Sequence, residues 1–138
     1  MCIRDSFVAA QDDGGTYDRA LTELRAGRKR THWTWFLFPQ VAGLGRSPTA
    51  VRYALADLAE ARAYLAHPVL GPRLRACAQA LLDLPTRDAR AVLGPVDAQK
   101  LRSSMTLFEA ADPADPVPAT VLDEWFGGER DPATLDRL

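Results

Sequence analysis

An apolar seam between residues 69 and 84 constrains the fold more than any other feature of the chain. The steps between its members alternate between four and three residues, which places them all on one face of an α-helix. Such a face has to be buried, so we expect the other elements to pack around this helix. The seam consists of Leu70, Leu74, Cys77, Leu81 and Leu84.

Further amphipathic stretches precede and follow the seam, and glycine or proline separates most of them. Their apolar residues recur every three to four positions, which is typical of helices. The stretches are residues 17–26, 48–56, 58–65, 98–111 and 119–126, with shorter helical turns at 7–11, 89–93 and 131–138. About seven or eight short helices with brief connections predict an all-α fold, packed as one compact single domain.

Several residues mark where these helices begin and end. Gly27 follows the first long stretch and suits the left-handed backbone that often closes a helix. Ser47 and Pro48 form a strong helix start, with a serine cap and a proline in the first turn. Asp57 is placed to cap the next helix.

The secondary structure between residues 33 and 38 is ambiguous from periodicity alone. Residues 33, 35 and 37 alternate as in a strand, whereas residues 32, 35, 36 and 39 would share one face of a helix. Pro39 ends either element, because its ring restricts the residue before it.

Composition excludes several classes of protein. The chain has 138 residues, 47% of them hydrophobic and 25% charged, with a net charge of −1. This length fits one domain, and the balanced charge disfavours a general nucleic-acid or membrane-surface binder. No apolar run approaches the roughly 20 residues that a membrane span needs. Two cysteines, Cys2 and Cys77, form no disulfide framework or metal-binding spacing, so we expect a cytoplasmic protein without metal or cofactor.

The first six residues, MCIRDS, are typical of a translated adapter leader. We therefore expect the folded domain to span residues 7–138, with Met1–Ser6 as a non-native leader. A native, frayed terminus is the alternative.

A basic segment lies beside the aromatic residues of the central stretch. Arg25, Arg28, Lys29 and Arg30 fall within six residues. Cations beside aromatic rings suit a phosphate group that carries a flat ring. The structural alternative is that these cations offset the negative end of the preceding helix dipole.

The aromatic residues and His32 allow the same two interpretations. His32 is a candidate general base, because an unperturbed histidine titrates near neutral pH. Trp33 or Trp35 could form a pocket wall, although tryptophans at this spacing are typical of a core. The glycine-punctuated loop before Ser47 could hold an anion on its backbone N–H groups, but a plain turn explains it equally.

Two further groups of polar residues lie later in the chain. His67 and Arg73 flank the start of the seam helix, where His67 could also serve as a helix cap. Lys100 and Ser104 are one helical turn apart. A nucleophilic Ser/Lys pair lacks the usual order and an oxyanion hole, so a lysine stem lying along the core edge is the simpler interpretation.

Four strings carry a resemblance to a known family: HWTWFLFPQ, GLGRS, YLAHPVLGPRL and KLRSSMTLF. With FVAAQ near the N-terminus, they resemble the bacterial domain-of-unknown-function family 1810, whose members are sometimes labelled "calpastatin". The resemblance covers nearly all of residues 7–138, and MCIRDS has no counterpart in it. It implies a mainly helical single domain and a helix at residues 33–38, but no activity. Thr34 departs from the methionine that many members carry.

The resemblance also marks a set of polar positions drawn from four segments, which a shared pocket would explain. We expect this pocket to bind an anionic, phosphate-bearing or nucleotide-like small molecule, with His32 or His67 as the acid/base if it is hydrolytic. The alternative is a non-enzymatic protein–protein interaction module with an unknown partner. The predicted ligand-binding residues are Lys29, His32, Trp33, Trp35, Gln40, Ser47, Tyr53, His67, Arg73, Lys100 and Ser104.

Overall fold

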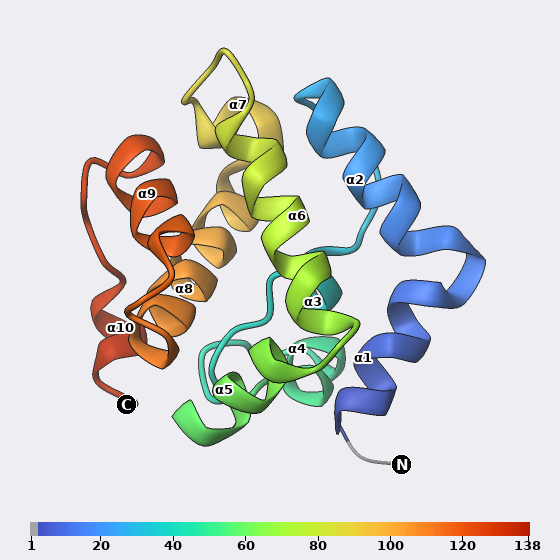
Figure 1. Ribbon diagram of the computed structural model, residues 1–138, viewed down its shortest axis with the longest axis vertical. Helices are drawn as coiled ribbons and strands as arrows, with labels where there is room; N and C mark the ends of the chain where they lie inside the picture. Colours follow the sequence, from blue (N-terminus) through green and yellow to red (C-terminus); the bar gives the residue numbers. More distant parts are fainter. Residues whose placement is uncertain (1–2) are drawn as a thin grey trace.

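The computed structural model describes residues 3–138, which fold as a bundle of helices (Figure 1). Helix α1 (Ile3–Asp12) is longer than the single turn expected from residues 7–11. Of the predicted leader, Met1 and Cys2 lie outside the described residues. Ile3–Ser6 form the first residues of α1. Its non-native origin stays a prediction.

The all-α class is confirmed. The helices of nine residues or more are α1, α2 (Thr16–Ala26), α5 (Leu58–Ala66), α6 (Leu70–Leu82), α8 (Pro95–Ala111) and α9 (Pro116–Trp125). Helices of four or five residues are α3 (Thr34–Leu37), α4 (Pro48–Arg52), α7 (Ala89–Leu93) and α10 (Pro132–Leu135), and a 3₁₀ turn (Asp13–Gly15) joins α1 to α2. With these short helices included, residues 3–138 contain more helices than the seven or eight predicted.

The predicted helix signals at three positions are confirmed. The Ser47 hydroxyl accepts a hydrogen bond from Ala50 N at 3.1 Å, and the Asp57 carboxylate accepts one from Glu60 N at 2.9 Å. Gly27 closes α2 with a φ of 76°, which a residue with a side chain rarely adopts. Local capping chemistry therefore identified these ends correctly.

The end of α4 was predicted wrongly, because a tertiary contact overrides the local pattern. The helix stops at Arg52 rather than continuing to Ala56. Leu55 N instead donates to the Gln40 carbonyl at 2.9 Å, and Leu55 O accepts from Ala42 N at 2.7 Å. This extended pairing, an isolated bridge between Val41 and Leu55, is not part of any strand within residues 3–138.

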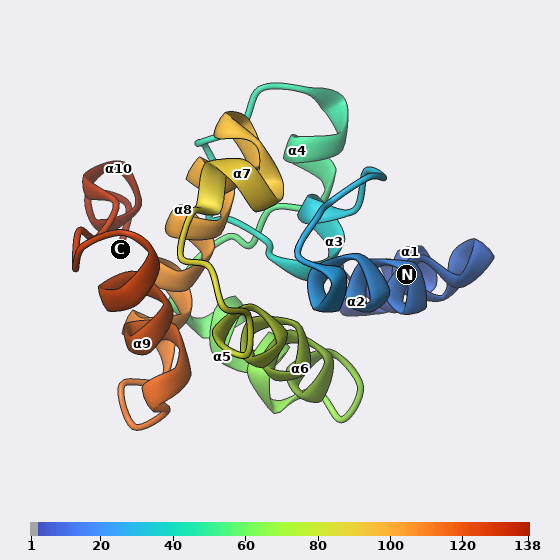
Figure 2. The ribbon, with the colours of Figure 1, turned by 90° about the horizontal axis from the view of Figure 1, so that it is seen from above.

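Helix α8 is the longest described helix, with seventeen residues, and lies between α9 and α6 in Figure 1. It begins at Pro95, three residues before the predicted start, because Gly94 with a φ of 86° turns the chain into it. Helices α5, α7, α9 and α10 all pack against α8, while α2 packs against α6 (Figure 2).

The predicted seam is buried, with no member more than 9% exposed. Aromatic rings join it to the rest of the core: Tyr64 on α5 lies 5.2 Å from Phe7 on α1 and 5.4 Å from Phe108 on α8, between ring centroids. Burial raises the pKa of the Cys77 thiol to about 12, which keeps it protonated and unreactive at neutral pH. The core therefore extends across α1, α5, α6 and α8.

The corner between α5 and α6 is tight. Gly71, in the first turn of α6, is buried against the backbone of the last turns of α5. A Cβ atom at this position would collide with the Leu65 carbonyl oxygen. The close approach of the two backbones therefore requires glycine here.

Within residues 3–138, no helix is both long enough and apolar enough to cross a membrane.

Candidate functional site

Four of the predicted residues meet at the start of α8, around Asp97. Lys29 Nζ lies 2.8 Å from Asp97 Oδ2, and Lys100 Nζ lies 3.6 Å from Asp97 Oδ1. Lys100 Nζ also sits 4.0 Å from the centroid of the Trp35 ring, and Lys29 Nζ sits 5.4 Å from that of Trp33. Two ammonium groups thus share one carboxylate beside two aromatic faces.

Trp33 belongs to the core rather than to a pocket wall. Its side chain is 1% exposed, and its Nε1 donates to Glu23 Oε1 at 2.9 Å. The same carboxylate accepts from Arg30 N at 2.6 Å, from Thr31 N at 3.0 Å and from the Thr31 hydroxyl at 2.7 Å. Sequence analysis missed Glu23, because nothing in its local pattern distinguishes it from a solvated helix residue.

These hydrogen bonds control the ionisation of Glu23. Burial alone would raise the pKa of its carboxyl, but the four donors outweigh burial and lower the pKa to about 2. The charged carboxylate at the end of α2 therefore holds the loop that leads to α3.

Ser104 is buried, and its hydroxyl has no hydrogen-bonding partner among the described residues. The neighbouring Ser103 differs, since its hydroxyl donates to Asp131 Oδ2 at 2.7 Å. Burial acts to raise the pKa of Asp131, but hydrogen bonds from Thr134 and Ser103 outweigh it and lower the pKa. The two serines thus form a matched pair for measuring the contribution of a buried hydrogen bond.

We expect Ser103→Ala to cost about 1–3 kcal/mol, because it removes a donor from a buried carboxylate. Ser104→Ala should change stability by no more than about 0.5 kcal/mol, because no hydrogen bond is lost. Urea denaturation of both variants measures the difference. Equal losses would contradict the assignment of Ser104 as unpaired.

Arg73 joins three helices instead of lining a cavity with the other predicted residues. Its Nη1 lies 2.8 Å from Asp12 Oδ1 and donates to Gln11 Oε1 at 3.2 Å, and its guanidinium lies 4.6 Å from the centroid of Tyr17. Gln11, fully buried, also donates to Tyr64 Oη at 3.2 Å. This network ties α1 and α2 to α6.

The two histidines lie apart in different environments. His32 is exposed in the loop before α3. His67 Nδ1 accepts hydrogen bonds from Val69 N at 3.1 Å and Leu70 N at 3.3 Å, so it serves as the helix cap that the sequence allowed. That nitrogen is therefore occupied and is not free to act as a base.

The remaining predicted residues are dispersed. Ser47 caps α4. Gln40 is half-buried, and its backbone carbonyl accepts the hydrogen bond from Leu55 N. Tyr53 packs against Phe36, with ring centroids 4.8 Å apart. The predicted ligand-binding set is therefore not gathered around one concavity. Its members at the start of α8 form one cluster, and their ligand-binding role stays a prediction.

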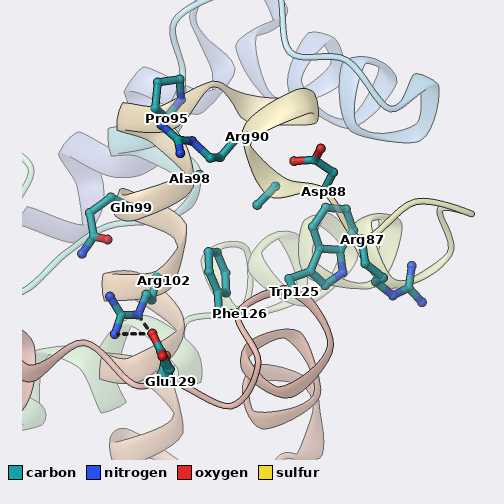
Figure 3. Close-up of a pocket in the computed structure, with 11 residues that line it drawn as sticks. Arg87, Asp88, Arg90, Pro95, Ala98, Gln99, Arg102, Trp125, Phe126 and Glu129 are labelled. Carbon is teal, nitrogen blue, oxygen red and sulfur yellow. Dashed lines mark hydrogen bonds and ion pairs between the residues drawn. The ribbon is translucent and has the colours of Figure 1, made fainter.

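A hollow of about 560 Å³ opens between α7, α8 and α9 (Figure 3), and none of the cluster residues lines it. None of the residues predicted from the sequence lines it. Arg90 reaches from α7 toward Pro95 at the start of α8, while Trp125 and Phe126 form the wall at the end of α9. The lining residues are Arg87, Asp88, Ala89, Arg90, Pro95, Ala98, Gln99, Arg102, Trp125, Phe126 and Glu129.

The arginines that line the hollow differ in the number of hydrogen bonds and ion pairs that they already make within the protein. Arg87 lies 2.8 Å from the Glu124 carboxylate and donates to backbone carbonyls. Arg102 donates to the Glu129 carbonyl at 2.9 Å, and its Nη2 lies 3.7 Å from the exposed Glu129 carboxylate. The exposed Arg90 side chain has no hydrogen bond or ion pair within residues 3–138. Arg90 is thus the cation most available to a ligand.

The start of α8 also favours a negatively charged group in this hollow. Helix α8 has seventeen residues and no side-chain cap, and Pro95, Ala98 and Gln99 bring its first turns into the lining. The positive end of its dipole therefore faces the hollow. Trp125 is 6% exposed and its Nε1 is buried without an acceptor, so Trp125 contributes ring surface to this wall, with the Arg87 guanidinium 5.6 Å from its centroid.

Sequence reasoning missed the hollow because its walls come from residues 87–90, 95–102 and 125–129, which only the fold brings together. The available signal was the pairing of Trp125 and Phe126 directly before two glycines. Residues 3–138 contain no group of three or more His, Cys, Asp or Glu side chains arranged to hold a metal ion.

Comparisons with known proteins agree with the resemblance carried by the four sequence strings. The chain matches the family described as "Protein of unknown function (DUF1810)" over residues 4–138. No curated protein matches it. Its structure is similar to the crystal structure of the conserved hypothetical protein Rv1873 from Mycobacterium tuberculosis, with a TM-score of 0.94 and 46% identity over 98% of this chain and 95% of that chain. The chain therefore belongs to the DUF1810 family of proteins of unknown function.

Proposed function

We propose that this protein binds an anionic small molecule with a flat ring in the hollow between α7, α8 and α9. The observation that carries the proposal is the combination of an unpaired Arg90 with an uncapped helix start and two aromatic side chains around one cavity. Its volume, about 560 Å³, falls within the roughly 300–1,000 Å³ typical of small-molecule sites. The proposal keeps the ligand class expected from the sequence but moves the site.

The charged and the aromatic side chains that line the hollow would contact different parts of a ligand. Arg90 and Arg102 would hold a phosphate or carboxylate group, and the positive end of the α8 dipole would favour its charge. Phe126 and Trp125 would pack against a ring at the other end. Phosphate-bearing compounds with a planar base fit this division, and the lining assigns no reaction to the site.

We expect adenosine monophosphate to raise the melting temperature by roughly 3–6 °C at a hundredfold excess over its Kd. A ligand that binds only the folded state contributes about 2.7 kcal/mol at that excess. Differential scanning fluorimetry with inorganic phosphate, ribose 5-phosphate and adenosine separates the anionic contribution from that of the ring. The proposal fails if none of these probes shifts the wild-type protein.

Two substitutions in the hollow should change affinity in opposite directions. Arg90→Ala should weaken binding roughly 10- to 100-fold, because a charge-assisted hydrogen bond contributes about 1.5–3 kcal/mol. Glu129→Gln should tighten binding roughly two- to fivefold, because its carboxylate competes for Arg102 with the energy of an exposed ion pair. Arg46→Ala is the matched control, since Arg46 is exposed elsewhere on the molecule. Isothermal titration calorimetry measures all three.

A non-enzymatic interaction module is the alternative function. It becomes the better account if Arg90→Ala binds every probe as tightly as the wild type does, because the hollow would then contribute nothing.

A further inference from the structure

The loop between α2 and α3 turns its cations to opposite sides. Lys29 points inward, where its side chain is 7% exposed and pairs with Asp97. Arg28 and Arg30, on either side of it, are exposed. Arg25, in the last turn of α2, is exposed as well. We call Arg25, Arg28 and Arg30 the arginine surface.

The backbone beneath the arginine surface is fixed from two directions. Arg28 N donates to the Glu23 carbonyl at 3.0 Å, and Lys29 N donates to the Val92 carbonyl on α7 at 2.8 Å. Arg30 N donates to the Glu23 carboxylate at 2.6 Å, and Thr31 donates to the same carboxylate through its N–H and hydroxyl groups. A partner would therefore meet a preorganised backbone, which lowers the entropic cost of binding.

No acidic side chain compensates these arginines in the part of the chain that the structure describes. The carboxylates beside the loop, Glu23 and Asp97, are turned inward and occupied by other donors. Within residues 3–138, the side chains of Arg25, Arg28 and Arg30 make no ion pair or hydrogen bond. Three unpaired cations therefore lie within six residues of a chain whose net charge is −1.

We propose that the arginine surface docks a short acidic segment of a partner protein. Guanidinium groups bind carboxylates through paired hydrogen bonds, and three exposed arginines within six residues suit a run of neighbouring Asp or Glu residues. None of these three arginines lines the hollow.

Two observations favour an acidic peptide over a nucleic acid. Single-stranded nucleic acids bind through aromatic rings on which bases stack, but Trp33 is 1% exposed and Trp35 is covered on one face by Lys100. The net charge of −1 also leaves the remainder of the molecule repulsive to a long polyanion.

Fluorescence anisotropy with a labelled octaglutamate peptide tests the proposal. We expect binding at low ionic strength that weakens as salt is added, since exposed ion pairs are screened. The double variant Arg28→Ala/Arg30→Ala should lose at least tenfold in affinity. Arg46→Ala/Arg52→Ala removes the same charge from another exposed site and should change affinity less than twofold.

Three results would overturn the proposal. The first is that the wild type does not bind the peptide, and the second is that both double variants lose the same affinity. The third is that a labelled 12-nucleotide RNA binds the wild type more tightly than the peptide does, and that Arg28→Ala/Arg30→Ala abolishes this RNA binding. Melting curves of the double variant check its fold.

Discussion

Alanine at position 71 is expected to lower the free energy of unfolding by at least about 3 kcal/mol. The added methyl group would overlap the Leu65 carbonyl oxygen, which belongs to the backbone of α5 and is not the end of a flexible side chain. Relief requires α5 and α6 to separate, and this separation would open the packing around Tyr64 and Leu70. Overpacking of this kind usually costs about 1–3 kcal/mol, and more when backbone has to move.

Gly15→Ala is the matched control for this substitution. Gly15 has a φ of 73° but no atom within contact range of an added Cβ, so its replacement tests backbone strain alone. We expect a loss of about 1–2 kcal/mol there. Guanidinium denaturation of both variants measures the two costs, and equal costs would contradict a collision at Gly71.

The second large effect is expected at Glu23. Replacing it with alanine should cost about 3–5 kcal/mol, because the buried Trp33 Nε1 and the backbone N–H groups of Arg30 and Thr31 lose their acceptor together. Glu129→Ala, which removes an exposed carboxylate, should cost no more than about 0.5 kcal/mol. Urea denaturation at pH 7 compares them. A cost below about 1 kcal/mol for Glu23→Ala would show that the loop does not depend on this carboxylate.

The stabilisation by Glu23 should also depend on pH. Its pKa is about 2 in the folded protein against an ordinary value of 4.5, so the charged form is favoured by folding. The contribution is complete above about pH 4.5 and is lost as the pH falls through the folded pKa of about 2. The shift corresponds to at most about 3 kcal/mol. The stability difference between wild type and Glu23→Gln should therefore shrink between pH 5 and pH 2, and a constant difference would contradict the assignment.

Local chemistry was sufficient to predict much of the fold. The spacing of the seam placed α6, and the caps at Ser47 and Asp57 placed the starts of α4 and α5. The errors came from contacts between distant residues. The pairing of Val41 with Leu55, for example, shortened α4.

The candidate site was harder to predict for the same reason. A polar side chain looks available in the sequence until its partner is known. Arg73 is matched by Gln11 and Asp12, which lie more than sixty residues earlier, and His67 is occupied by the backbone of α6. The hollow contains no string of residues recognisable from spacing, because the turns of three helices form its walls.

The packing of four helices against α8 has a consequence for synthesis of the protein. Helices α2, α5 and α6 leave the ribosome before α8, yet α5 buries its apolar face against α8. Domains fold as units, and exposed apolar surface invites aggregation. The nascent chain therefore carries unburied apolar faces until residue 111 has emerged, and this interval is when a chaperone would be needed most.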